Sequence, residues 1–170
     1  SLDRASIPSI RSAGADLAST VTIVVLTTTS GQTMCAQTRE TTRDRLAIMV
    51  GTNAYGPFAL TALLMPAVTG RVVSLGSLST RLARADLSDF EQARGAYSVS
   101  KAYAYSKHGV HAFAFELERR LRASGSSVQS VLAHPGFALD GSASPRPGIT
   151  DLTSAGPRFA ERLLRPVSHR

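Results

Sequence analysis

The sequence is short of several residue types, and each shortage excludes something. Cys35 is the single cysteine, so no disulfide can form within the chain, which fits a reducing compartment. There is no tryptophan, and aromatic residues make up 6% of the 170 residues. The formal net charge of +7 is of the kind that attracts nucleic acid, but the arginines are scattered and few aromatic residues lie among them. We therefore expect no nucleic-acid partner.

The sequence also lacks a long apolar run. The longest, residues 58–68, is interrupted by Thr61 and Pro66 and is too short to cross a bilayer. The first residues, Ser1-Leu2-Asp3-Arg4, form no apolar signal core. These features predict a cytoplasmic protein with no membrane partner.

Strand-like and helix-like segments alternate along the rest of the chain. β-Branched runs ended by Gly or Pro predict strands, and longer apolar periodicity predicts helices, so the pattern favours an α/β fold with a parallel sheet. Successive crossovers would place the strands side by side in chain order. The expected helices are residues 6–17, 39–65 and 97–123, and the expected strands are residues 21–26, 71–75 and 128–133. Residues 1–140 would hold this fold, and residues 141–170 a mobile loop region with a short C-terminal helix.

Ligands of open α/β sheets bind beyond the carboxyl ends of the strands. Three segments qualify: the one after Leu26, the Gly76-Ser77 turn, and His134-Pro135-Gly136. Ser77 could therefore meet a tyrosine from the helix that follows.

The chain has only two lysines, and each follows a tyrosine by four residues, in Tyr97/Lys101 and Tyr103/Lys107. Residues at i and i+4 of a helix share a face. An ammonium beside a phenol favours the phenolate, and such a tyrosine can exchange a proton with a substrate oxygen. Spacing alone leaves both pairs as candidates.

Pro57 interrupts the helical pattern of residues 39–65. It has no N–H to give to the carbonyl of Asn53, four residues earlier, and its ring crowds that carbonyl. We expect a kink there and a carbonyl at Asn53 that can hold a water molecule.

Several segments together resemble the short-chain dehydrogenase/reductase family, in particular the retinol-dehydrogenase-like oxidoreductases common in actinobacteria. The resemblance covers about residues 2–140, and it rests on residues 2–7 (LDRASI), 50–58 (VGTNAYGPF), 71–77 (RVVSLGS), 103–107 (YAYSK), 116–121 (ELERRL) and 133–136 (AHPG). It implies a Rossmann-like doubly wound parallel sheet with flanking helices. The number of residues between the motif lysine and the later motifs matches the family when that lysine is Lys107. Tyr97 would then be a neighbour of the site.

The resemblance implies a catalytic tetrad of Asn53, Ser77, Tyr103 and Lys107. Tyr103 would exchange the proton, Lys107 would favour its phenolate and bind the nicotinamide ribose, and Ser77 would bond the substrate oxygen. Asn53 would hold a relay water. Reduction of a small-molecule carbonyl, or oxidation of an alcohol, with NAD or NADP is the function implied; the substrate, the choice of cofactor and the direction are left open.

The resemblance also implies cofactor contacts beyond the tetrad. Asp3 would meet the adenine, Gly31 would lie near the cofactor, and Pro135 and Gly136 would lie against the nicotinamide. The family's first strand and its Thr-Gly-x-x-x-Gly-x-Gly phosphate loop are missing, and Asp140 stands where a threonine is usual. We therefore expect a fold incomplete at its N-terminal side, with weak or absent cofactor binding and impaired oxidoreductase activity in this chain alone.

Two other functions stay open. The long helices could serve as a non-catalytic module that forms a homodimer. Ser77, His134 and Asp140 have the residue types of a serine hydrolase, although Ser77 lacks the Gly-x-Ser-x-Gly context. His108 and His111 lie three residues apart, but no third ligand accompanies them, so no metal site is expected.

Overall fold

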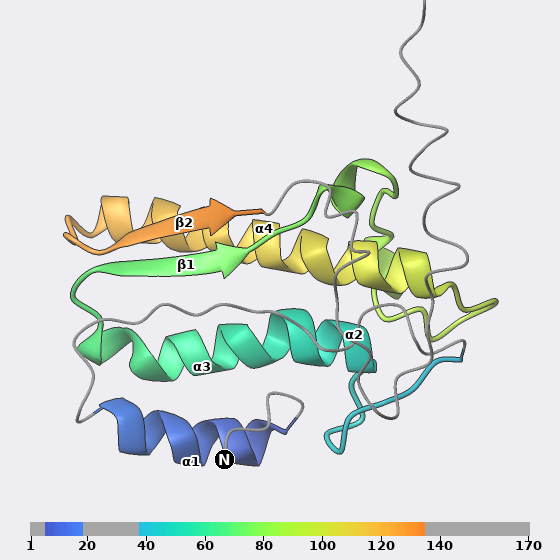
Figure 1. Cartoon of the computed structure of the whole chain (residues 1–170), viewed down its shortest axis with the longest axis horizontal. Helices are drawn as coiled ribbons and strands as arrows, with labels where there is room; N and C mark the ends of the chain where they lie inside the picture. The colour runs from blue at the N-terminus through green and yellow to red at the C-terminus, as the bar shows by residue number, and fades with distance from the viewer. Residues whose placement is uncertain (1–5, 19–37, 135–170) are drawn as a thin grey trace, which may run out of the picture. The chain divides into compact units, whose positions relative to one another are not determined.

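The computed structural model describes residues 6–18 and 38–134 (Figure 1). The chain divides into two compact units, Ser1–Gly136 and Phe137–Arg170, and every described residue belongs to the first. Several predictions fall outside the described residues: the strand at residues 21–26, the region after residue 140, and the roles of Asp3, Gly31, Pro135, Gly136 and Asp140.

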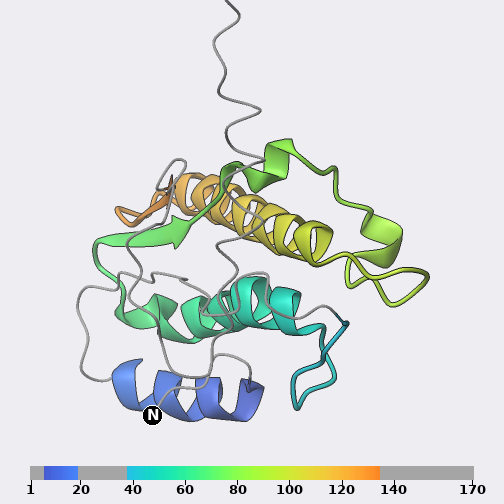
Figure 2. The same cartoon turned by 45° about the vertical axis from the view of Figure 1, so that its right-hand side comes forward.

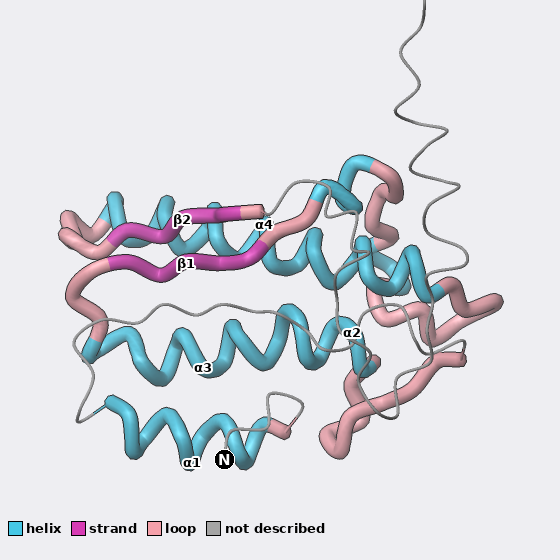
Figure 3. The backbone as a smooth tube through the Cα atoms, viewed as in Figure 1, coloured by secondary structure: helices cyan, strands magenta, loops and turns pink. Residues whose placement is uncertain are grey.

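Two strands form the sheet of the described part of the chain. Strand β1 (Arg71–Leu75) pairs in parallel with β2 (Gln129–Ala133), from Arg71 opposite Gln129 to Leu75 opposite Ala133 (Figure 3). Parallel pairing of these two segments confirms the α/β class predicted from the sequence. Both strands therefore end at the same edge of the sheet.

Helix α4 (Val99–Ala123) connects the two strands and packs against both. Its beginning and end follow from local sequence: the Ser98 side chain accepts a hydrogen bond from the Lys101 N–H, and Gly125 adopts a φ of 69° after the last turn. Hydrogen bonds from Gly125 N to Arg122 O and from Ser126 N to Leu121 O complete a Schellman motif. The predicted helix at residues 97–123 is thus confirmed except that Tyr97 precedes its cap. Short 3₁₀ turns, Leu78–Arg81 and Leu87–Asp89, lie between β1 and α4.

The helix predicted at residues 39–65 is wrong over its first nine residues. The observed helix begins with α2 (Ile48–Val50), which follows a loop closed by an antiparallel bridge between Thr41 and Ala47. Arg45 in this loop has a φ of 62°, which no helix allows. The Ala47 N–H donates to the Glu91 carboxylate at 2.8 Å. A residue 44 positions away in the sequence therefore accepts the backbone hydrogen bond at the N-terminal end of the helix. The local periodicity of the segment cannot indicate such a distant partner.

A π-helical turn, Gly51–Tyr55, joins α2 to α3 (Gly56–Leu64), which ends in a 3₁₀ turn, Met65–Ala67. Gly56 N–H donates to Gly51 O, a bond one residue wider than in an α-helix. The turn ends at Tyr55, two residues before Pro57. A helical irregularity is therefore present around Asn53, as a widened turn, and a freed Asn53 carbonyl that holds water stays a prediction.

Apolar residues from distant segments form the main core. Helix α1 (Ile7–Ala18) packs on α3, and both Figure 1 and Figure 2 show α3 between α1 and the strands. At Gly14 a Cβ would lie 3.0 Å from the Leu63 Cβ, so the two helices approach closely. The buried residues of this core are Ile10, Leu60, Leu64, Val68, Val72, Leu121 and Val128.

A second, smaller cluster lies near the carboxyl end of the sheet. Val50 and Ala54 pack against Val110 of α4, with Phe90 and Leu132 beside them. This cluster packs the π turn against the middle of α4.

One helical stretch in the described ranges, Ile48–Ala67, is long and apolar enough to cross a membrane. It is more extended than the apolar run recognised in the sequence because α2, the π turn and α3 are continuous. Of its most apolar window, 61% is buried within the fold. Packing on α1 and α4 accounts for this apolar character, as expected of a core helix.

Candidate functional site

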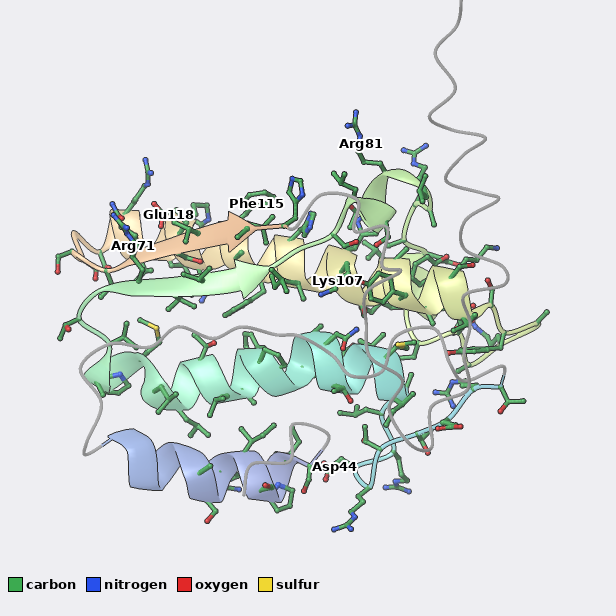
Figure 4. All side chains as sticks on the ribbon, viewed as in Figure 1. Asp44, Arg71, Arg81, Lys107, Phe115 and Glu118 are labelled. Carbon is green, nitrogen blue, oxygen red and sulfur yellow. The ribbon has the colours of Figure 1, made fainter. Side chains whose placement is uncertain are left out.

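Lys107 is a buried ammonium at the carboxyl end of β1. Its exposed fraction is 3%, and its Nζ donates to the backbone carbonyl of Leu75, the last residue of β1, at 2.9 Å. Figure 4 labels Lys107 on α4. Its Nζ lies 5.6 Å from the centre of the Tyr103 ring, one turn earlier on the same helix. Burial of a charge is costly unless polar groups surround it, so this lysine marks a polar region of the interior.

Asn53 and Ser106 connect the π turn to the turn of α4 that carries Tyr103 and Lys107. The Asn53 Nδ2 donates to Ser106 Oγ at 2.9 Å, and that hydroxyl donates to the Tyr103 carbonyl at 2.7 Å. Asn53 and Ser106 are fully buried. Asn53 Oδ1 has no hydrogen-bond partner within the described part of the chain. The bond to Ser106 fixes the Asn53 amide, and its Oδ1 atom is a buried hydrogen-bond acceptor at the site.

Gly109 permits this connection. A Cβ at Gly109 would lie 3.0 Å from the Ala54 Cβ and 3.4 Å from the Phe90 ring. The lack of a side chain therefore lets α4 approach the π turn closely enough for Asn53 to reach Ser106.

Ser77 lies in the turn that follows β1. Gly76 N–H donates to Ala133 O at 2.7 Å, which ties this turn to the end of β2. The Ser77 Oγ accepts from Ser79 N–H at 3.2 Å, and its O–H hydrogen remains available for donation. Ser77 N–H donates to the Nε2 atom of His111 at 3.3 Å.

The other tyrosine–lysine pair has a different environment. Tyr97 precedes the cap of α4, so it does not share a helical face with Lys101, and Lys101 is exposed. Burial and the nearby Glu40 carboxylate raise the pKa of the Tyr97 phenol. These conditions disfavour the phenolate that proton exchange near neutral pH requires.

Sequence reasoning missed two residues of this region, Ser106 and His111. Ser106 follows Tyr103 by three residues, a spacing that places both on one side of α4, and this was the available signal. His111 was considered only as half of a metal pair with His108. Over the residues that the structure describes no group of three metal-ligating side chains occurs, and His108 Nε2 instead lies 2.7 Å from Ala83 O.

The arrangement gathers an ammonium, a phenol and a hydroxyl where two parallel strands end, the usual ligand edge of such a sheet. The Lys107 ammonium and the Tyr103 phenol can each bond a hydroxyl group, so their chemistry fits the ribose of the nicotinamide half of a dinucleotide. Tyr103 and Lys107 are the described residues that would hold it.

No family model matches the sequence, but individual proteins do. The chain is 35% identical over 144 residues to a mouse polyprenol dehydrogenase, which covers 79% of this chain and 42% of that protein. It is 33% identical over 142 residues to human retinol dehydrogenase 13, covering 81% of this chain and 42% of that protein. The chain thus spans about two fifths of the length of these curated relatives.

Solved structures are similar as well. An uncharacterised protein from Mycobacterium paratuberculosis matches with a TM-score of 0.70 and 33% identity, over 90% of this chain and 52% of that one. A metagenomic short-chain oxidoreductase in complex with NADP matches with a TM-score of 0.57 and 18% identity, over 81% of this chain and 58% of that one. The second likeness concerns the fold alone.

The parallel strands and flanking helices define part of a Rossmann-like α/β fold. The relatives specify the family further: the chain belongs to the short-chain dehydrogenase/reductase family.

Proposed function

We propose that this protein is an NAD(P)-dependent oxidoreductase that interconverts a carbonyl and an alcohol. The observation that carries the proposal is the buried Lys107 ammonium, held by Leu75 at the end of β1 with the Tyr103 ring beside it. An ammonium in this position can stabilise negative charge that develops on the phenol oxygen during proton transfer. The pair can therefore donate and recover a proton.

Each described residue of the tetrad has a distinct role. Tyr103 donates its hydroxyl proton to the carbonyl oxygen during reduction and accepts it from the alcohol during oxidation. The Ser77 hydroxyl donates a hydrogen bond to the same substrate oxygen and stabilises the charge that develops there. Lys107 stabilises the phenolate that remains after the proton has left Tyr103.

Asn53 acts through its neighbours. Its amide holds Ser106, and Ser106 holds the backbone carbonyl of Tyr103, so the π turn orients the turn of α4 that carries the proton donor. The unpaired Oδ1 atom of Asn53 is an acceptor for a relay water.

The cofactor contacts are proposed residue by residue. A bound nicotinamide dinucleotide supplies or accepts the hydride. Lys107 and Tyr103 would contact its ribose, and the roles of Asp3, Gly31, Pro135 and Gly136 stay predictions because these residues lie outside the described ranges. NADP and NAD are both proposed as cofactors.

Affinity for either cofactor should be low in the 170-residue chain by itself. The sequence contains no Thr-Gly-x-x-x-Gly-x-Gly loop to bind the pyrophosphate. Each charge-assisted hydrogen bond that is lost costs about 1.5–3 kcal/mol, and about 1.4 kcal/mol is tenfold in affinity. Calorimetric titration should therefore give dissociation constants in the millimolar range. A low-micromolar constant would contradict this prediction.

The names of the relatives suggest a substrate class. Polyprenol and retinol are long apolar alcohols, so we propose an apolar alcohol or its aldehyde as the substrate. Cytoplasmic localisation is likewise retained as a proposal.

Deuteride transfer tests the proposed function. The purified chain is incubated with NADH or NADPH deuterated at the nicotinamide C4, at millimolar concentration so that weak binding does not conceal the reaction. Retinal, a polyprenal and a short aliphatic aldehyde serve as carbonyls, and the alcohols are analysed by mass spectrometry. We expect deuterium at the carbinol carbon with at least one of them.

The matched control is the double variant Ser77→Ala/Tyr103→Phe, which should form no deuterated alcohol. Absence of deuterium with all three carbonyls and both cofactors, in a chain shown to be folded, would refute the proposal.

A further inference from the structure

His111 lies on α4 and touches the backbone of the turn after β1. Ser77 N–H donates to His111 Nε2 at 3.3 Å. A Cβ at Gly76 would lie 2.5 Å from the same Nε2 atom, so the ring fills the space that a side chain there would need. The imidazole is therefore packed directly against the backbone that presents Ser77.

These contacts determine the tautomer of His111. A backbone N–H can only donate, so His111 Nε2 must be the unprotonated nitrogen and Nδ1 must carry the hydrogen. His108, three residues earlier on α4, has the opposite tautomer. Its Nε2 faces the Ala83 carbonyl, which can only accept, so that nitrogen carries the hydrogen.

Protonation of His111 is incompatible with the observed contact. The imidazolium has a hydrogen on both ring nitrogens, and its Nε2–H would point at the Ser77 N–H. Lys107 and His108 on α4 and His134 after β2 act electrostatically on the ring, and Phe115 packs against it edge to face. Burial, followed by these three basic groups, lowers the pKa of His111.

We infer that neutral His111 is a positioning residue, which holds the Gly76–Ser77 turn and hence the Ser77 hydroxyl, and which releases the turn when it is protonated. Its role in the reaction rests on the proposed function. The coupling between the His111 ring and the Gly76–Ser77 turn is independent of the proposed function.

The inference makes an unusual prediction for the pH dependence of reduction. A tyrosine that donates a proton stays protonated in acid, so by itself it gives no loss of rate at low pH. Release of Ser77 by His111 would make kcat/KM fall by about tenfold per pH unit below the His111 midpoint. The midpoint itself should lie below the ordinary histidine value of about 6.5.

NMR spectroscopy of the 170-residue chain tests the coupling without any need for activity. Histidine ring ¹⁵N shifts at alkaline pH should identify the Nδ1–H tautomer of His111 and the Nε2–H tautomer of His108. The Ser77 amide shift should titrate with the His111 midpoint. An Nε2–H tautomer at His111, or a Ser77 amide that does not follow its titration, would overturn the inference.

Three variants separate the explanations. His111→Gln keeps an acceptor that does not titrate, so the Ser77 amide should stay in place while its pH dependence disappears. His111→Leu removes the acceptor and should shift the Ser77 amide at every pH. His108→Gln is the matched control on the same helix and should retain the Ser77 titration. If the leucine variant does not fold, the glutamine variant alone decides between coupling and its absence.

The deuteride-transfer rate, measured over the same pH range, distinguishes the two proposals. Transfer whose acid loss persists in His111→Gln would overturn the inference and leave the function intact. Coupled titration of Ser77 and His111 without any transfer would support the coupling and refute the function.

Discussion

Tyr97/Lys101 and Tyr103/Lys107 have the same spacing and opposite surroundings. Lys101 is exposed near the beginning of α4, whereas Lys107 lies six residues further along, buried against Leu75 of β1. Tyr97 lies before the helix, and its raised pKa keeps it protonated. The difference shows that a four-residue spacing does not by itself decide whether the lysine is buried, because contact with a neighbouring strand decides it.

The largest difference between the two pairs should appear when each phenol is removed. Tyr103→Phe should lower the rate of deuteride transfer by about 10²–10⁴-fold, because general acid–base catalysis contributes that much. Tyr97→Phe should change it less than about threefold, since no substrate proton is assigned to it. Steady-state rates at millimolar cofactor measure both. Similar losses in the two variants would mean that the pairs are not functionally distinct.

Replacing each lysine by arginine sharpens the comparison. Lys107→Arg should reduce transfer by about 10-fold or more, because a planar guanidinium cannot replace a compact buried ammonium between a carbonyl and a phenol ring. Lys101→Arg is the control and should change neither the rate nor the free energy of unfolding by more than about 0.5 kcal/mol. Rate measurements and urea denaturation follow both variants, and an unaffected Lys107→Arg would contradict the assigned role.

Ser106→Ala tests whether Asn53 supports the second pair. The substitution leaves the buried Asn53 Nδ2 without its acceptor, which should lower the free energy of unfolding by about 1–3 kcal/mol. Ser100→Ala removes an exposed serine of the same helix, and a change within about 0.5 kcal/mol is expected. Urea denaturation compares them. Equal stabilities would show that the buried amide finds another partner.

Gly109→Ala tests the close approach of α4 to the π turn. The added methyl would strain the contact with Ala54 by about 1–3 kcal/mol, and the better helix propensity of alanine would recover about 1 kcal/mol. We expect a net loss of about 1 kcal/mol in thermal or urea unfolding. At Gly70 a Cβ would meet nothing within 4 Å, so Gly70→Ala is the control without a clash. A Gly109→Ala variant more stable than the wild type would refute the packing argument.

Local pattern alone was sufficient for several elements. Short segments that end at Gly76 and at His134-Pro135-Gly136 indicated β1 and β2. Ser98 and Gly125 delimit α4 through a cap and a left-handed residue, both within a few residues of the helix ends. The irregular turn before Pro57 follows from the missing N–H of proline. These features depend on covalent geometry and neighbouring residues, so the sequence could predict them.

The start of α2 could not be predicted in this way. The segment from residue 39 has helical periodicity, yet Arg45 turns the chain and Glu91 caps the helix at Ala47. A charged side chain 44 residues away overrides local propensity, because an unpaired N–H at a buried helix end is costly.

By itself, the sequence determined the parallel α/β class, the residue types of the proposed tetrad and the resemblance to a family, because these depend on order and spacing. Only the tertiary structure decided which lysine is buried, that Asn53 reaches Ser106, and that His111 lies on Ser77. Those facts depend on how α4 packs against β1 and the π turn. Burial and hydrogen-bond partners come from segments distant in sequence, so spacing along the chain cannot specify them.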